Sequence, residues 1–156
     1  MKRLVAPLLL LCLTQVVCGQ SYSDDKVALA NFLKRMYTAA PFDGVKVLDD
    51  YNAKFLVSIV ALDKAKYPSE ATMNRVSQVK AQSQASTFLN GATISMDMVI
   101  TTEETADGQG NVASVVETVE RIKQNSIGFS QGLELLVNFD HPDGLRHVFV
   151  YLREMK

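Results

Sequence analysis

The stretch at residues 53–62, Ala-Lys-Phe-Leu-Val-Ser-Ile-Val-Ala-Leu, predicts a long β-strand because it is rich in β-branched and apolar residues. Successive side chains of a strand point to opposite faces of its sheet. The apolar residues here occupy both faces, with Phe55, Val57, Ile59 and Ala61 on one and Leu56, Val60 and Leu62 on the other. We therefore expect an interior strand in a sheet that is covered on both sides.

The segment before this strand predicts a helix from Asp24 to Ala40. Ser23 or Asp24 can cap it, and Pro41 ends it because the residue before a proline avoids helical geometry. Its apolar residues follow the spacing i, i+3, i+4, i+7 of a single helical stripe: Leu29, Phe32, Leu33 and Met36.

The segment after the strand predicts a second, longer helix, with Ser69 as its N-cap and Asn90 near its end. Gly91 is the type of residue that adopts a left-handed conformation just past a helix. One side of this helix combines small and large apolar residues, which allows close approach to a sheet: Ala81, Ala85, Phe88 and Leu89.

The rest of the chain alternates between strand and helix patterns. We expect strands over 45–49, 92–100, 133–139 and 145–153, a loop over 102–111 and a helix over 112–122. The turn sequence His141-Pro142-Asp143-Gly144 joins the last two strands as a hairpin. The order α-β-β-α-β-α-β-β predicts one α+β domain over residues 20–156, with a mainly antiparallel sheet.

Residues 1–19 have the layout of a secretory signal peptide. Lys2 and Arg3 are followed by an apolar core at 4–13 that is too short to span a membrane, and small residues near Gly19 suit cleavage. We therefore expect an exported protein, either periplasmic or associated with the outer membrane.

Both cysteines, Cys12 and Cys18, lie in this leader, so cleavage after Gly19 leaves a chain without disulfides. An alternative is cleavage before Cys18, which would then carry a lipid anchor. The residues before Cys18 fit a lipoprotein cleavage site poorly, since Val17 and Gln15 stand where a small residue and a leucine are usual. Membrane attachment is expected only in this alternative.

Charge argues against a nucleic-acid partner. Without Lys2 and Arg3, 14 of the 16 basic residues remain against 17 acidic residues, a net charge of −3. Nucleic-acid-binding domains are typically basic.

The sequence Gly128-Phe129-Ser130-Gln131-Gly132 matches the G-x-S-x-G motif of serine hydrolases. That motif needs a strand before it and a helix after it, whereas the pattern here is the reverse, so we interpret it as a glycine-rich connection. No other segment carries a catalytic signature, and we expect no enzymatic activity.

The region around the predicted turn contains several residues of types that can bind metal ions. Asp140, His141, Asp143 and His147 are close in sequence, but residues of these types are also ordinary turn chemistry. The loop at 107–111 lacks the ligand pattern of a calcium-binding loop. We therefore expect no metal and no cofactor.

Alternation on the last strand places Phe149 and Tyr151 opposite Val148, Val150 and Leu152, and Leu136 also points away from its main apolar face. A second apolar face must be covered. Either the first helix lies across it, or Leu136, Phe149 and Tyr151 bind a partner protein or a second copy of the chain.

The second half of the chain, from about Arg75 to Leu152, resembles small exported domains of the Lpp-type lipoproteins and of the N-terminal domain of the flagellar assembly protein T. The resemblance rests on residues that shape the fold: Ala81, Ala85, Phe88, Leu89, Gly91, the strand 94–100, Ile122, Gln124, Ser126, Gly128, Gly144 and Tyr151. It implies an envelope-associated α+β module that works by interaction and has no catalytic residues.

The leading hypothesis is thus a non-catalytic bacterial envelope protein that acts as an interaction or assembly module. The alternative is a carrier for a small apolar or amphipathic ligand, held between the sheet and its helices. Methionines are adaptable lining residues, and four of them were candidates for such a site: Met36, Met73, Met96 and Met98.

Overall fold

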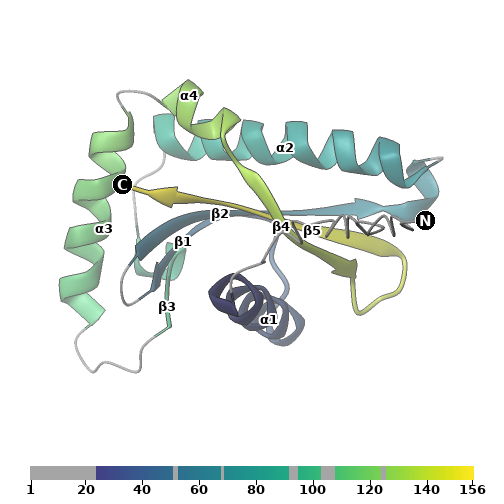
Figure 1. Ribbon diagram of the computed structural model, residues 1–156, viewed down its shortest axis with the longest axis horizontal. Coiled ribbons are helices and arrows are strands. Elements are labelled where there is room, and N and C mark those ends of the chain that lie inside the picture. The colour runs from purple at the N-terminus through teal and green to yellow at the C-terminus, as the bar shows by residue number, and fades with distance from the viewer. Residues whose placement is uncertain (1–23, 51–52, 68, 92–94, 103–107, 124–125) are drawn as a thin grey trace, which may run out of the picture.

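The computed structural model describes residues 24–156 except 51–52, 68, 92–94, 103–107 and 124–125 (Figure 1). The described chain contains helices and one five-stranded sheet, which confirms the predicted α+β class. The elements in order are α1 (Asp24–Ala39), β1 (Gly44–Asp50), β2 (Ala53–Asp63), η1 (Lys64–Lys66), α2 (Glu70–Gly91), η2 (Met96–Met98), β3 (Val99–Thr101), α3 (Gly108–Lys123), α4 (Ser126–Gln131), β4 (Glu134–Asp140) and β5 (Arg146–Met155).

The strands lie side by side in the order β3-β1-β2-β5-β4. The strand β2 is central and pairs with β1 and β5 in antiparallel orientation, as does β4 with β5. The short β3 pairs with β1 in parallel orientation. The stretch at residues 53–62 is therefore the interior strand that its two apolar faces predicted, and the sheet is mainly antiparallel.

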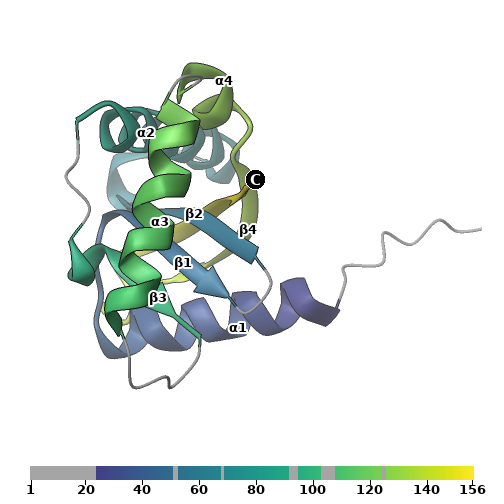
Figure 2. The ribbon, with the colours of Figure 1, turned by 90° about the vertical axis from the view of Figure 1, so that its left-hand side faces the viewer.

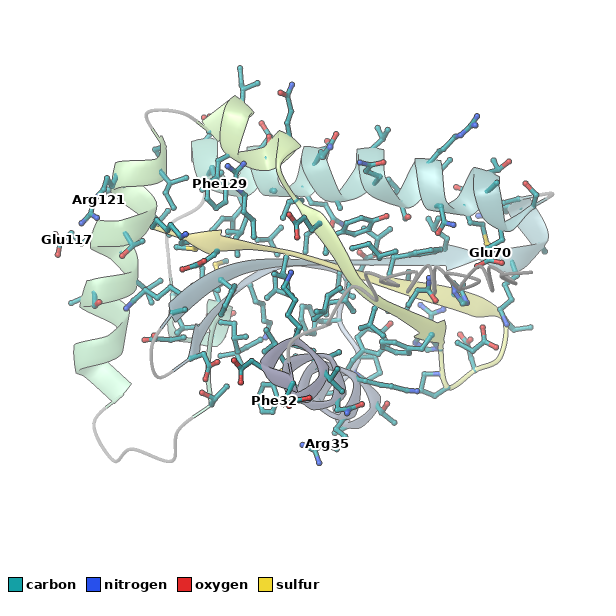
Figure 3. The ribbon with its side chains drawn as sticks, in the orientation of Figure 1. Phe32, Arg35, Glu70, Glu117, Arg121 and Phe129 are labelled. Atoms are coloured by element: carbon teal, nitrogen blue, oxygen red, sulfur yellow. The ribbon has the colours of Figure 1, made fainter. Side chains whose placement is uncertain are left out.

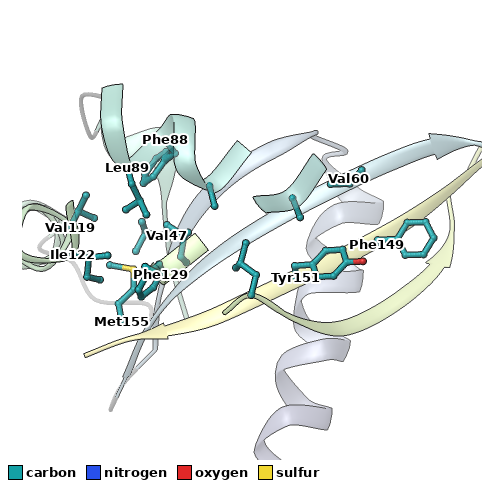
Figure 4. Packing of buried hydrophobic residues seen from close by; sticks show 14 of the residues in the cluster. Val47, Val60, Phe88, Leu89, Val119, Ile122, Phe129, Phe149, Tyr151 and Met155 are labelled. Carbon is teal, nitrogen blue, oxygen red and sulfur yellow. The ribbon is translucent and has the colours of Figure 1, made fainter. Parts of the chain in front are cut away.

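Helix α2 covers one face of the sheet, and Figure 1 shows it running along the strands above them. Its small residues Ala81 and Ala85 are fully buried, so the helix backbone lies close to the sheet. Phe149 and Tyr151 of β5 belong to the apolar cluster beneath it, together with Phe129 of α4 (Figure 4). Helix α3 packs across one end of the sheet, in front of the strands in Figure 2, and closes this cluster.

Helix α1 covers the opposite face. Its buried residues Leu29, Leu33 and Tyr37 contact a second apolar cluster on that face. The strand residues of this cluster are Leu48, Val57, Ile59, Leu136, Phe139, Val148, Val150 and Leu152. The sheet is thus the middle of three layers, and each face is covered by helices of the same chain.

The start of α2 agrees with its sequence signal, but its end does not. The Ser69 hydroxyl accepts the backbone N–H of Thr72 at 3.2 Å, so Ser69 is the N-cap of α2. Gly91 is the last residue of α2 and has no positive φ, contrary to the expectation of a left-handed residue there. Positive φ angles occur instead at Gly44, the first residue of β1, with φ of 131°, and at Gly144, with φ of 71°, in the turn that joins β4 and β5.

The prediction of a long strand over 92–100 is confirmed at Val99 and Ile100 but is wrong for residues 95–98. The 3₁₀ turn η2 occupies Met96–Met98, and only Val99–Thr101 pair with β1. The Ser95 carbonyl accepts the N–H of Met98, and the Ser95 hydroxyl bonds the Asp97 carboxylate. A serine that bonds nearby groups in this way offers the backbone an alternative to a sheet.

The predicted element order also lacks one helix. Residues Ser126–Gln131 form the short helix α4, where the sequence predicted a glycine-rich connection. Helix α3 begins at Gly108, inside the predicted loop. Glycine is unfavourable in the interior of a helix, so the sequence pattern predicted no helix at these two places.

A β-bulge in β4 changes which of its residues face α1. The register of β4 against β5 shifts between Leu135 and Val137, so Leu136 is the extra residue. Leu136 and Phe139 consequently face the same cluster, although strict alternation predicted opposite faces. Leu136 is also on the opposite side of the sheet from Phe149 and Tyr151.

Two buried hydrogen-bonded contacts join α2 to the sheet. The Tyr151 hydroxyl lies 2.8 Å from the Ser77 hydroxyl, and the Ser58 hydroxyl of β2 donates to Gln84 Oε1 at 2.8 Å. Gln84 in turn donates to Asp43 before β1 at 2.9 Å. Buried polar groups need such partners, so these contacts fix how α2 sits on the strands.

The substitution Tyr151→Phe tests the first of these contacts. We expect it to lower the free energy of unfolding by about 1 kcal/mol, because the hydrogen bond is lost while Ser77 keeps its bond to the Asn74 carbonyl. Urea denaturation of the variant and of Ser77→Ala would measure it. If the double variant costs as much as the two single changes added together, the two hydroxyls do not interact.

Candidate functional site

The partner-binding surface predicted from the sequence is buried within the chain. Phe149 is 0%, Tyr151 4% and Leu136 7% exposed. Helix α2 covers Phe149 and Tyr151, whereas the sequence assigned that face to the first helix. Leu136 lies under α1 because of the bulge. These three residues therefore form no exposed face.

Two other predictions concern residues 1–19. The signal peptide at residues 1–19 and the candidate lipid anchor Cys18 lie outside the described residues. Among the residues that the structure does describe, no helix has the length and apolar character needed to cross a membrane.

The serine of the G-x-S-x-G motif lies inside α4. The Ser130 hydroxyl is buried and donates to the Ile127 carbonyl at 3.0 Å. His141 and His147 are near the start of β5, whereas α4 packs beside the end of that strand, as Arg153 contacts show. The motif thus does not bring a serine and a histidine together.

The four residues weighed as metal ligands form two separate polar contacts at the β4–β5 turn. His147 Nδ1 lies 2.8 Å from Asp140 Oδ1, which also accepts Lys64 Nζ at 2.7 Å. The bonds from Lys64 and then His147 hold the pKa of Asp140 below its ordinary value. The described residues contain no group of three histidine, cysteine or acidic side chains placed to hold a metal ion.

Asp143 organises the turn itself. Its Oδ1 accepts the backbone N–H groups of Leu145 and Arg146, and its Oδ2 accepts Arg146 Nε at 2.7 Å. Arg146 Nη2 also lies 2.9 Å from Nε2 of the buried His141. Desolvation raises the pKa of Asp143, but the hydrogen bonds outweigh it and hold the pKa well below its ordinary value.

The change Asp143→Asn is expected to destabilise the protein at neutral pH, because the charged bonds to Arg146 are lost. The carboxylate's contribution is present above the ordinary aspartate pKa of about 3.9 and is lost as the pH falls toward the lower folded-state pKa. The difference in free energy of unfolding between the two proteins should therefore shrink on acidification. Urea titrations from pH 7 downward would show this, and a difference independent of pH would contradict it.

The methionines do not gather in one ligand site. Met73 and Met98 pack on the α2 side of the sheet, whereas Met36 packs on the α1 side. The side chain of Met96 lies outside the described part of the chain. The carrier hypothesis therefore loses the lining that the sequence suggested for it.

A cleft of about 690 Å³ lies at one end of the sheet, beside the last residues of β5; we term it the end cleft. Its apolar lining is Phe55, Ile122, Phe129 and Leu152, and its polar lining is Lys26, Gly132, Glu134, Arg153, Glu154 and Lys156. Its volume falls within the range of about 300–1,000 Å³ that is usual for binding pockets. The lining comes from all three layers of the fold and from both helices that pack at this end.

The Arg153 side chain lines the end cleft and joins β5 to α4. Its Nη1 donates to the carbonyl oxygens of Gly128 at 2.7 Å and Phe129 at 2.5 Å, and so caps the C-terminal end of α4. Its guanidinium lies over the Phe129 ring at 4.6 Å, and Figure 3 shows that ring between α4 and the end of β5. A Cβ on Gly132 would collide with the guanidinium, so any other residue there would displace Arg153 from this position.

The cationic side chains around the end cleft differ in whether they are paired with a carboxylate. Lys26 pairs with Glu134 and Lys156 with Glu154, each at 3.5 Å and exposed to solvent, where such pairs contribute little. Arg153 is paired with no carboxylate of the described residues, since its contacts are the two carbonyls and the ring. The cleft therefore combines an apolar floor with one cation that is not neutralised.

Three comparisons with known proteins were made for the whole chain. No family model, no curated protein and no solved structure matches it. The end cleft must therefore be interpreted from its own chemistry.

Sequence reasoning missed the end cleft because its lining residues are far apart in the chain. The one local signal was the second glycine of the G-x-S-x-G motif, which leaves space for a side chain from β5. A glycine alone does not tell which side chain fills that space.

Proposed function

We propose that this protein is a non-catalytic binding module of the bacterial cell envelope and that a protein partner binds at the end cleft. The observation that carries the proposal is that helices of the same chain cover both faces of the sheet. The faces of the sheet are therefore closed to a partner, whereas the end cleft offers apolar area beside an unneutralised cation.

The outer strand β4 is less suited to binding a partner along its length. It carries a bulge near its start and exposed acidic residues, Glu134 and Asp140, at its two ends. Bulges and charges are the devices by which natural edge strands avoid pairing with other chains. Two copies of β4 placed antiparallel would also bring acidic ends together, which disfavours a dimer at this edge.

A second candidate is a carrier for a small amphipathic ligand. The apolar lining of the end cleft and its volume favour this function. Native mass spectrometry of the purified protein would test it, because a carrier is expected to retain a small molecule whose mass disappears in a variant that fills the cleft from its rim, such as Glu154→Trp.

Site-specific photo-crosslinking in the native host tests the protein-binding proposal. A photoreactive residue at Glu134, on the rim of the end cleft, is expected to give a discrete adduct with one partner. The same residue at Val79, which is 65% exposed on the outer side of α2, is the matched control. Adducts of equal yield at both positions would contradict a partner site at the end cleft.

The location of the protein is tested separately. Mass spectrometry of the native N-terminus is expected to find Gln20 as the first residue, as export and cleavage after Gly19 require. A lipid-modified Cys18 would instead show a tethered protein, and an intact Met1 would contradict export.

A further inference from the structure

The last residues of β5 have an open edge toward the end cleft. Strand β5 pairs with β2 from Arg146 to Met155, but β4 pairs only with the part of β5 from His147 to Leu152. The outer side of Arg153–Met155 therefore has no neighbouring strand in the described sheet. Backbone N–H and C=O groups point alternately to the two sides of a strand, so this edge directs backbone groups toward the cleft that no residue of β4 pairs with.

We propose that the end cleft binds the C-terminus of an extended peptide, with an apolar last residue and a free α-carboxylate, as a short strand beside Arg153–Met155. This inference rests on the proposed function, because it names the kind of protein segment that the module takes. Strand addition supplies main-chain hydrogen bonds, and the cleft supplies selectivity for the side chain.

The position of β4 explains why a chain end fits better than an internal segment. A peptide that pairs with Arg153–Met155 lies in the same row as β4, which begins at Glu134. The added strand must therefore stop where β4 begins. A chain that continued past this point would collide with β4 or leave the sheet.

The charge of the cleft selects a carboxylate over an ammonium group. Arg153 uses only Nη1 for its bonds to α4, which leaves the N–H groups of Nε and Nη2 as donors. A guanidinium binds a carboxylate with two parallel hydrogen bonds, which are stronger than bonds between neutral groups. Lys26 and Lys156 on the rim add positive charge, and Glu134 and Glu154 partly offset it.

The apolar lining accommodates the last side chain. Phe129 and Ile122 line the cleft from the α2 side of the sheet and Leu152 from the α1 side, all almost fully buried, and the half-buried Phe55 of β2 lies with Leu152. An aliphatic side chain placed there removes apolar area from water. A fatty acid would satisfy the floor and the guanidinium but would leave the backbone edge of β5 unpaired, so the edge favours a peptide.

Fluorescence anisotropy with the chain from Gln20 to Lys156 tests the inference. The probe is the labelled peptide Gly-Gly-Val-Val-Leu with a free carboxylate, compared with its C-terminal amide and with the same peptide extended by two glycines. We expect the free acid to bind about ten- to hundredfold more tightly than the amide, the range of a charged hydrogen bond. The extended peptide should bind as weakly as the amide.

Arg153→Gln is expected to reduce the preference for the acid to less than about threefold, since it removes the charge that the carboxylate meets. Arg153→Lys should restore part of the preference, which a purely structural role for Arg153 would not do. Lys66→Gln, at the opposite end of the sheet, is the control and should leave the preference unchanged. The amide's affinity for each variant shows whether the cleft still folds.

The outcomes separate this inference from the proposed function. Equal binding of the acid and the amide, or no binding of either, would contradict the inference that the end cleft binds a peptide C-terminus. Crosslinking at Glu134 would still support a partner site in that case. Laurate that displaces the labelled acid at equal or lower concentration would overturn the choice of a peptide. Loss of the crosslink together with tight binding of the acid would overturn the protein partner in the host.

Discussion

Replacing Phe149 by alanine is expected to lower the free energy of unfolding by about 3–5 kcal/mol. The side chain is fully buried on the α2 side of β5, and its ring packs against His147 at a centroid distance of 4.9 Å. Removing it leaves a cavity that the central strands cannot close. Urea or thermal denaturation would measure the loss, which is large relative to a typical stability of 5–15 kcal/mol.

The matched control for this change is Val79→Ala on the outer side of α2. Val79 is 65% exposed, so its truncation should change the free energy of unfolding by no more than about 0.5 kcal/mol. A small effect of Phe149→Ala would show that Phe149 is not covered by α2. It would then return Phe149 to the partner-binding role that the sequence first suggested.

Replacing Leu33 by alanine should cost about 2–5 kcal/mol, because this residue is the fully buried centre of the α1 contact with the sheet. Val27→Ala, on the same helix but 44% exposed, should cost much less. Chemical denaturation of both variants measures the difference. If the two changes had equal effects, α1 would not lie on the face that carries Val148 and Val150.

The two predictions together test the three-layer arrangement. Phe149 belongs to the cluster under α2 and Leu33 to the cluster under α1, and they are separated by the sheet. If both layers unfold as one cooperative unit, each variant should show a single transition that coincides by circular dichroism and fluorescence. Separate transitions in Leu33→Ala would show that α1 detaches first.

The sequence predicted the long elements well because their periodicity extends over many residues. The interior strand β2 follows from apolar residues on both of its faces, and α2 follows from its N-cap Ser69 and its buried small residues. These patterns reflect burial directly, so the structure could only satisfy them by covering both sides of the sheet. What the pattern did not determine was which helix covers which face.

The predictions that failed have a different cause. Alternation of apolar and polar side chains does not determine whether the backbone pairs with a neighbouring strand. Residues 96–98 alternate like a strand, yet only the three residues after them lie beside β1. Leu136 alternates away from the core, yet the bulge at that position turns it inward. In both places a local hydrogen bond or an extra residue overrides the period.

The end cleft could not be predicted because its chemistry depends on contacts between distant residues. Arg153 is available there because Gly132 has no side chain and because β4 is shorter than β5. Neither strand length nor the reach of an arginine is visible in the spacing of residues. The apolar residues of the floor also serve the core, so their pattern gave no separate signal.

The strand order of the sheet has a consequence for how the chain reaches its folded state. The central strand β2 is made early in synthesis, but one of its two neighbours is β5, whose register pairs Lys54 with Met155. Contacts between residues so far apart in the chain slow folding, because the long loop between them must be closed first. The nascent chain therefore keeps β2 half-paired until β5 emerges. Residues 53–62 are consequently the part of the sheet most exposed to aggregation before β5 arrives.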